Sequence, residues 1–275
     1  MTRAASRIVT VFNSKGGAGK SRLCLGLADV LHSHGVRVLI IDSDPEQATC
    51  AKMTRPTAPS SKFPVEGVVL RMRMAAGPGG ALVPDLDGYL ADVQALAAGY
   101  DVVLIDLPAR TEAPEQLAAI IGADLVLIPS KLDGSDLDAL QDQAIPKLNL
   151  CLDEIARLQK QVSPDEPERL PDIAIVPMDA QLQFNVEKIG LERLHRIAQE
   201  NDYLQVPVTH TVVPNSVALK ELTTLMTSIS KTATKKVARD AVLDALRNVA
   251  LEVRLLDAMH PPKRKVRKNL KEGVA

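Results

Sequence analysis

The chain has 275 residues, of which 46% are hydrophobic and 2% aromatic, and its net charge is −1. This apolar content is enough for the aliphatic core of one large α/β domain or two small ones. Scarce aromatic residues argue against recognition of single-stranded nucleic acid by base stacking. The three cysteines, Cys24, Cys50 and Cys151, lack C-x-x-C spacing, which argues against a disulfide framework or a zinc site and indicates a reducing, cytosolic compartment.

The first residues carry no targeting signal that the sequence reveals. Residues 1–6 lack the apolar region of about 7 to 15 residues that a signal peptide needs. No apolar run approaches the ~18 residues needed to span a bilayer. We therefore expect a cytoplasmic protein.

A glycine-rich loop with two lysines follows the first expected strand, residues 8–12. The loop reads NSKGGAGKS over residues 13–21, and Leu23, Leu27, Val30 and Leu31 then recur at helical spacing. A common P-loop reads G-x-x-x-x-G-K-[ST]. Aligning its end with residues 19–21 puts Ser14 at the first glycine and Lys15 directly after it. The loop is therefore predicted to bind phosphate but departs from the common pattern.

Each loop residue has an expected role in phosphate chemistry. Gly16, Gly17 and Gly19 allow successive N–H groups to point at phosphate oxygens. Lys20 is expected to reach the β- and γ-phosphates, and the Ser21 hydroxyl is expected to ligate Mg²⁺. A plain turn between a strand and a helix is the alternative.

Strand-like and helix-like segments alternate after the loop. Further strands are expected at residues 36–41, 67–72, 102–105, 125–128, 173–176 and 208–213. This order predicts an α/β fold with a doubly wound, mostly parallel sheet of about seven or eight strands flanked by helices. Residues 53–64 and 75–84 are predicted to be surface loops, and residues 162–171 an exposed connection.

The loop and four later segments together resemble the ParA/MinD family of deviant Walker A P-loop ATPases, and ParA-type partition ATPases in particular. The four segments are VLIIDSDP at 38–45, YDVVLIDLP at 100–108, ADLVLIPS at 123–130 and TVVPNSVAL at 211–219. In this family ATP is held between two facing subunits. The resemblance therefore implies a slow, partner-stimulated ATP hydrolase that forms a homodimer in its ATP state.

The resemblance also implies roles for three charged residues that lie outside the common pattern. Lys15 matches the signature lysine that crosses to the partner subunit's nucleotide. Asp44 matches the carboxylate that positions the attacking water, and Asp42 an acidic residue near Mg²⁺. A helix cap or turn is the alternative for both aspartates. Asp106 is expected in the Mg²⁺ shell, or else merely ends a buried strand.

The nucleotide is expected to contact the loop and two later strand ends. The predicted contacts are Gly16, Gly17, Ala18, Gly19, Lys20, Ser21, Arg22, Met178 and Pro214. Arg22 stands where the family usually has a small hydroxyl residue, so only its backbone N–H is assigned a phosphate contact. Met178 and Pro214 fall where relatives build the adenine pocket, although Met178–Asp179 equally fits a strand-end turn. Asn215 occupies a position often held by arginine in DNA-binding members.

The C-terminal part combines an apolar stripe with a basic tail. Val242, Leu246, Val249, Val253 and Leu256 recur at three or four residues, which predicts a helix packed on the core of a single ATPase domain, residues 1–260; a surface for a partner is the alternative. Residues 261–275 form a tail with a net charge of +5, against −6 for the rest. Its basic residues are Lys263, Arg264, Lys265, Arg267, Lys268 and Lys271.

Three interpretations of the tail stay open. It is interpreted first as a flexible arm for non-specific DNA, second as a solvated end, and third as an amphipathic membrane anchor, for which it offers little apolar area. We therefore expect a nucleoid-associated ATPase that positions a plasmid, a chromosomal locus or another cargo through a cargo-bound adaptor. The alternatives are a MinD-like membrane-surface regulator, a ParA-like protein of conjugative transfer or protein-cluster positioning, and a metabolic P-loop enzyme.

Overall fold

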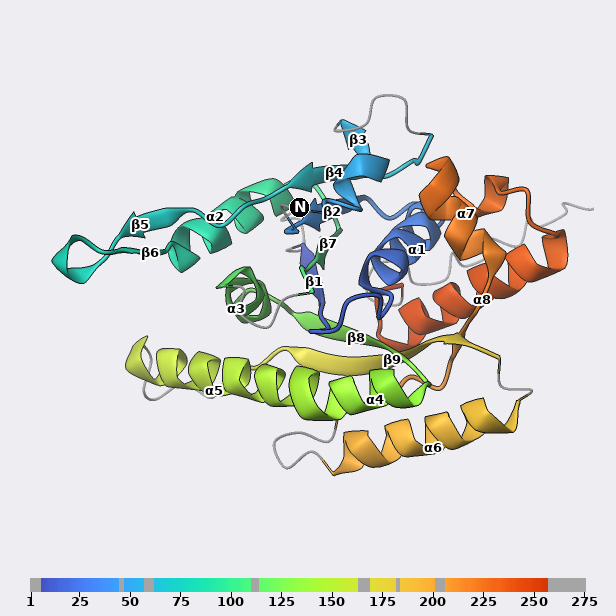
Figure 1. The fold of residues 1–275 in the computed structure, drawn as a ribbon. Helices are drawn as coiled ribbons and strands as arrows, with labels where there is room; N and C mark the ends of the chain where they lie inside the picture. Colours follow the sequence, from blue (N-terminus) through green and yellow to red (C-terminus); the bar gives the residue numbers. More distant parts are fainter. Residues whose placement is uncertain are drawn as a thin grey trace, which may run out of the picture.

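The computed structural model describes residues 6–44, 47–56, 62–109, 114–162, 169–181, 184–200 and 206–256. Within these ranges an eight-stranded parallel sheet forms the centre of the molecule (Figure 1), which confirms the predicted fold class. The strand order is β10-β9-β8-β1-β7-β2-β4-β3. The strands are β1 (Arg7–Val11), β2 (Val38–Asp42), β3 (Arg55–Pro56), β4 (Glu66–Val69), β7 (Val102–Asp106), β8 (Leu125–Lys131), β9 (Asp172–Ala180) and β10 (Val213–Pro214).

Helices cover both faces of this sheet (Figure 1). One face carries α1 (Lys20–Ser33), α7 (Val217–Leu225) and α8 (Lys236–Glu252), and the other carries α2 (Leu86–Ala97), α3 (Pro114–Ile121), α4 (Gly134–Ala139), α5 (Ile145–Val162) and α6 (Asn185–Gln199). Shorter helical turns are η1 (Ala51–Met53), η2 (Pro78–Gly80), η3 (Leu140–Ala144) and η4 (Ile229–Lys231). In β7, Leu104 packs into one core and Val103 and Ile105 into the other. Burial on both faces explains why the central strands are continuously apolar.

The predicted C-terminal stripe packs on the chain's own core. All five of its residues are buried, and they join the cluster that includes α1. Gly26 of α1 permits a close approach, because a Cβ added there would lie 2.8 Å from Leu246 Cδ1. This observation confirms the packing expected from the helical spacing.

The last expected strand, residues 208–213, forms only at its ends. Val208 makes a single bridge with Ile175, and regular pairing resumes at Val213 in β10. Between them the N–H groups of His210 and Thr211 donate to the Glu252 carboxylate, at 2.6 and 3.0 Å. The prediction of a continuous strand was therefore wrong, because a side chain of α8 binds the amides that a neighbouring strand would otherwise bind.

The segment predicted as a surface loop at 75–84 contains a β-hairpin. Strands β5 (Met74–Ala76) and β6 (Leu82–Pro84) pair antiparallel and project from the body of the molecule (Figure 1). Gly79 and Gly80 make the turn with φ of 72° and 81°. The loop interpretation was wrong for these paired residues, although Leu82 is 70% exposed. The strand expected at 67–72 likewise ends at Val69, and residues 53–64 include the last residue of η1 and the edge strand β3.

Several predicted features lie outside the described residues. These are most of the connection at 162–171 and the whole basic tail with Lys263, Arg264, Lys265, Arg267, Lys268 and Lys271. Within the part of the chain that the structure describes, no helix is both long and apolar enough to cross a membrane.

Parallel pairing brings the carboxyl ends of the strands to one edge of the sheet. The glycine loop follows β1, Asp44 follows β2, Asp106 ends β7 and Asp179 lies at the end of β9. Ligands of open α/β sheets bind at this edge. Residues distant in sequence therefore meet at one candidate site.

Candidate functional site

The side chain of Asn13 anchors the start of the glycine loop through two hydrogen bonds. Its Nδ2 donates to the Pro129 carbonyl, and its Oδ1 accepts from the Lys15 N–H, both at 2.8 Å. Gly17 and Gly19 have φ of 75° and 102°, a region that disfavours other residues. Gly16 does not have a positive φ, so only two of the three glycines expected to need conformational freedom use it. Ala18 is completely buried.

Lys20 begins α1 and lies in the wall of a cavity of about 290 Å³. Its Nζ donates to the carbonyls of Asn13 and Lys15, at 2.9 and 3.1 Å. Burial lowers the pKa of Lys20, while the nearby carboxylates of Asp106 and Asp44 raise it. The cavity is lined by the following described residues: Gly16, Gly17, Gly19, Lys20, Ser21, Arg22, Asp44, Gln47, Thr49, Asp106, Leu107, Ala109 and Thr223. We call it the phosphate cavity.

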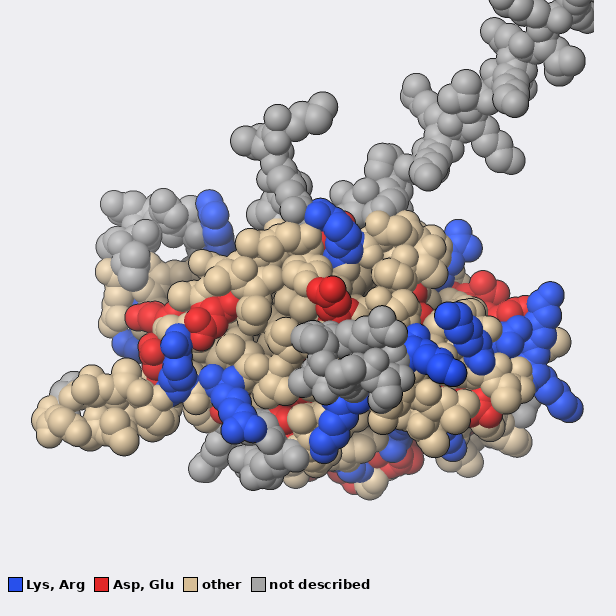
Figure 2. Space-filling view, turned by 90° about the horizontal axis from the view of Figure 1, so that it is seen from above, with Lys and Arg blue, Asp and Glu red and all other residues tan. Residues whose placement is uncertain are grey.

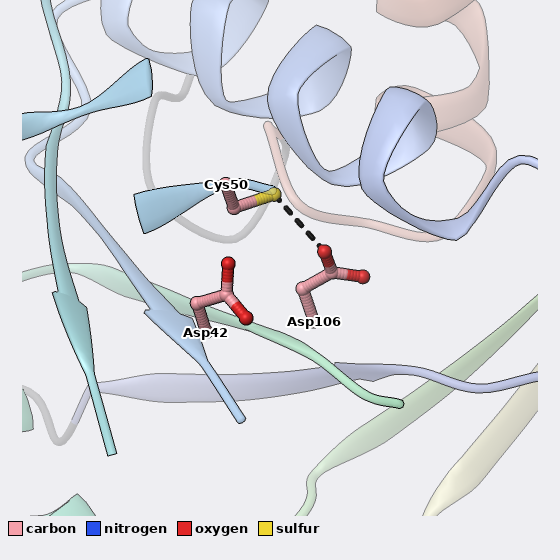
Figure 3. Close-up of side chains that lie close together, drawn as sticks. All are labelled: Asp42, Cys50 and Asp106. Atoms are coloured by element: carbon pink, nitrogen blue, oxygen red, sulfur yellow. Dashed lines mark hydrogen bonds between the residues drawn. The ribbon is translucent and has the colours of Figure 1, made fainter. Parts of the chain in front are cut away.

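Asp106 supplies a buried oxygen without a protein partner at this cavity. Its Oδ2 accepts from the Cys50 thiol at 3.1 Å, and the Ser21 side chain also donates to the carboxyl group. Its Oδ1 is buried and has no partner among the described residues. In Figure 3 this second oxygen points away from Cys50 and Asp42. A carboxylate oxygen beside a serine hydroxyl is the donor set that Mg²⁺ prefers, so these residues fit the expected ion.

Burial raises the pKa of Asp106 to about 6, against the lowering effect of the Ser21 hydrogen bond. Between the ordinary pKa of 3.8 and 6 the folded chain binds more protons than the unfolded chain, so stability falls as pH rises through this window. Above pH 6 the buried charge costs up to about 3 kcal/mol.

We therefore expect Asp106→Asn to raise the free energy of unfolding at pH 7.5, in chelator and without nucleotide, by up to about 3 kcal/mol. The gain should disappear below about pH 3, where Asp106 is protonated in both states. Urea denaturation at both pH values measures it. Asp138→Asn, with a side chain 61% exposed, is the control. A variant less stable than wild type at pH 7.5 contradicts the assigned burial cost.

Asp42 and Cys50 lie beside Asp106 in a buried cluster (Figure 3), and their ligand atoms all lie within 4.8 Å of one another. Asp42 Oδ1 accepts from the Asp44 N–H at 3.0 Å, and Oδ2 from the Ala51 N–H at 2.9 Å. Asp42 therefore shapes the turn after β2, as the alternative interpretation proposed, while lying near the expected ion. Burial raises the pKa of the Cys50 thiol well above its ordinary value. No spacing in the sequence pointed to Cys50.

Asp44 lines the phosphate cavity and also forms a local turn. Its Oδ1 accepts from the Gln47 N–H at 3.0 Å, and its carbonyl accepts from the Ala48 N–H at 2.9 Å. Asp44 is half-buried and lines this cavity. The position is compatible with both the catalytic and the turn-forming interpretation.

Lys15 lies at the rim and pairs with the start of α4. Its Nζ is 2.7 Å from Asp136 Oδ2 and 2.8 Å from Ser135 Oγ. Asp133 caps this helix by accepting from the Asp136 N–H at 3.0 Å, and Asp136 is 6% exposed. Unlike Lys20, Lys15 does not line the phosphate cavity. The two lysines of the loop therefore point to different places.

A second cavity of about 500 Å³ adjoins the phosphate cavity, and Arg22 lines both. We call it the outer cavity. Arg22 pairs there with Asp179, and Ala180 and Asn215 also line it. Met178 is instead completely buried, with its Cε 3.4 Å from where a Gly19 Cβ would lie, and Pro214 is half-buried beside Asn215. The side chains that line the outer cavity are the sequence neighbours of Met178 and Pro214 and not these two residues, so their predicted contact with a nucleotide stays a prediction.

The model of the CobQ/CobB/MinD/ParA nucleotide-binding domain matches residues 9–229. The chain belongs to this family. All five segments that carried the resemblance to ParA and MinD lie within or overlap the matched residues, and the phosphate cavity lies among them. Membership of a nucleotide-binding family accounts for the glycine loop, the buried lysine and the unpartnered carboxylate oxygen at one edge of the sheet.

Two relatives are named for chromosome partitioning and for the maintenance of carboxysome distribution. The chain is 29% identical over 141 residues to the chromosome-partitioning ATPase Soj of Thermus thermophilus, covering 47% of this chain and 56% of Soj. It is 27% identical over 134 residues to the maintenance of carboxysome distribution protein A of Gloeobacter kilaueensis, covering 49% and 53%. The matches span about half the length of these relatives.

A solved structure of the cell division ATPase MinD of Pyrococcus furiosus shares the fold. It superposes with a TM-score of 0.58 at 16% identity, covering 90% of this chain and 99% of MinD. At this identity the likeness concerns the fold alone.

Proposed function

We propose that this chain is an ATP-dependent dimerising switch that hydrolyses ATP slowly and positions a cargo. The observation that carries the proposal is that the side chains of two lysines of one loop lie in different places. Lys20 is buried in the phosphate cavity, whereas the ammonium of Lys15 lies outside that lining and pairs with Ser135 and Asp136 of α4. A lysine at the rim is available to a nucleotide in a facing subunit, provided that it leaves Asp136.

Each residue of the site has a proposed role in nucleotide binding or hydrolysis. The N–H groups of the loop and the start of α1 bind phosphate oxygens, and Lys20 neutralises the terminal phosphates. Ser21 and Asp106 would hold Mg²⁺, with Asp42 nearby; the ion supplies charge neutralisation of the phosphates. Asp44 orients a water toward the terminal phosphate. Lys15 of the facing subunit adds a positive charge where negative charge accumulates, which couples turnover to dimerisation.

Asp44→Ala should bind ATP but turn it over at least about tenfold more slowly, because the variant no longer orients the water. Its ATP dimer should then persist. Phosphate release and light scattering on the same samples measure both effects. Gln47→Ala also changes a residue that lines the phosphate cavity and serves as the control. Turnover equal to wild type would remove Asp44 from this role.

Non-specific DNA binding in the ATP state is proposed from two groups of basic residues. The first is the tail, which concentrates a charge of +5 in fifteen residues. The second consists of exposed lysines of α7, η4 and the start of α8: Lys220, Lys231, Lys235 and Lys236. In Figure 2 Lys and Arg gather toward the end of the molecule where α7 and α8 lie, and elsewhere they alternate with acidic residues. Such patches bind the phosphate backbone without reading sequence.

Retention of random-sequence duplex DNA at increasing salt tests this part. Wild type with ATP and Mg²⁺ should retain DNA at low salt and release it steeply as salt rises. Deleting residues 261–275 should reduce the slope of log affinity against log salt concentration by up to about five. Lys235→Glu combined with Lys236→Glu should weaken DNA retention further. Equal retention with ATP and ADP would contradict a switch. Retention on anionic vesicles instead of DNA would favour the membrane-surface regulator.

The cargo and its adaptor remain part of the same proposal. A slow ATPase that binds DNA would be cytoplasmic and nucleoid-associated. A cargo-bound adaptor that stimulates hydrolysis would release the ATPase from DNA near the cargo. Two relatives, Soj and the carboxysome distribution protein, are named for partitioning and for distribution, and this supports the proposal that the chain positions a cargo.

A further inference from the structure

Among the residues that the structure describes, Arg22 is the one shared by the linings of the phosphate cavity and the outer cavity. Arg22 lines both cavities and is the third residue of α1, directly after the P-loop serine. A nucleotide with its phosphates in the phosphate cavity can extend past Arg22 into the outer cavity. This inference rests on the proposed binding of a nucleotide, and it concerns the part of the nucleotide beyond the phosphates.

Arg22 is fixed in place by a two-pronged ion pair with Asp179. The Nη1–Oδ1 distance is 2.8 Å and the Nη2–Oδ2 distance is 2.6 Å. The two side chains are 22% and 10% exposed, so the pair is largely shielded from water. Asp179 has a φ of 56°, an uncommon conformation for aspartate, at the end of β9. Such a fork holds the guanidinium plane in one orientation and leaves its faces uncovered by the carboxylate.

The outer cavity offers a nucleobase little else to stack on. Its described lining residues include no aromatic side chain; besides Arg22 and Asp179 they are aliphatic or charged, such as Leu132, Val186 and Lys220, apart from Ala180 and the amide Asn215. Arginine guanidinium planes stack on π-systems, and bases stack on arginine in nucleic-acid complexes. We propose that Arg22, held flat by Asp179, is the surface on which the nucleobase stacks in this aromatic-poor protein.

The main alternative is that Arg22 acts through charge alone, as a clamp on the phosphate nearest the sugar. Lysine keeps the charge and loses the plane, so Arg22→Lys separates the two roles. Inorganic tripolyphosphate carries the phosphates without a base, so its binding reports a phosphate clamp and is blind to stacking. A variant that still binds tripolyphosphate has kept a folded P-loop, so the second ligand also serves as a folding control.

Calorimetric titration of the full chain with ATP and with tripolyphosphate, both with Mg²⁺, tests the proposal. Arg22→Lys should weaken ATP about tenfold and change tripolyphosphate less than about twofold. Asp179→Asn should weaken ATP several-fold, because the guanidinium is no longer held. Arg193→Lys, which alters the exposed ion pair with Asp138, is the matched control and should change neither.

Three results would overturn the proposal. If Arg22→Lys weakens the binding of ATP and of tripolyphosphate equally, Arg22 is a phosphate clamp. If Arg22→Lys leaves the affinity for ATP unchanged, Arg22 is not part of the site. If Asp179→Asn leaves the affinity for ATP unchanged, Asp179 does not hold the guanidinium. Failure of the wild-type chain to bind ATP would instead refute the proposed function. The two failures are therefore distinguishable.

Discussion

Lys20→Ala is expected to reduce ATP affinity at least about a hundredfold. Lys20 is buried in the wall of the phosphate cavity, and Asp106 and Asp44 are close enough to influence its pKa. Without its charge the cavity keeps two carboxylates and repels phosphate. Two charge-assisted hydrogen bonds to phosphate oxygens account for about 3 kcal/mol or more, which corresponds to this loss. Equilibrium titration with fluorescent ATP in Mg²⁺ measures it.

Lys20→Ala also removes hydrogen bonds to the carbonyls of Asn13 and Lys15, so the fold of the loop needs its own control. The thermal unfolding midpoint should be compared with that of wild type without nucleotide. Lys188→Ala changes an exposed lysine on α6 and should leave ATP affinity unchanged. Near-normal ATP binding by a folded Lys20→Ala variant would place the phosphates elsewhere.

Lys15→Gln is expected to keep ATP affinity within about threefold of wild type and to lose ATP-dependent dimerisation and stimulated turnover. The reason is geometric, since Lys15 does not line the phosphate cavity and its ammonium pairs with Asp136 and Ser135. A loss of affinity as large as in Lys20→Ala would mean that Lys15 serves the nucleotide of its own subunit. ATP titration and light scattering on the same preparation separate the outcomes.

Asp136→Asn provides the complementary variant. In the described structure the Asp136 carboxylate competes for the ammonium that the proposed dimer needs, and burial raises the pKa of Asp136 while Lys15 lowers it. Removing the charge should let the dimer form at lower ATP concentration. If dimerisation in this variant requires more ATP than wild type, the pair supports the dimer rather than opposing it.

The central strands and the P-loop could be predicted because their signals are local. Four consecutive buried apolar residues in each of β2 and β7, and a strand–glycine loop–helix order, depend on neighbours in sequence. The stripe of α8 was predictable for the same reason, since Leu246 and Val249 repeat at helical spacing on one face.

The features that sequence reasoning missed depend on distant partners. The strand expected at 208–213 is interrupted because Glu252, about forty residues later, binds the amides of His210 and Thr211. The partner of Lys15 lies on α4, 121 residues away, and that of Arg22 lies 157 residues away at the end of β9. Cys50 meets Asp106 only because β2 and β7 are neighbours in the sheet. No periodicity or motif contains these pairings.

The most direct test of a nucleotide-controlled dimer is the molar mass of the full chain in solution. Multi-angle light scattering in Mg²⁺ should give the chain mass of 29.6 kDa with ADP and about twice that value with ATP. Lys15→Gln should stay at the monomer mass with either nucleotide. A wild-type mass that is the same with ATP and with ADP would contradict the account.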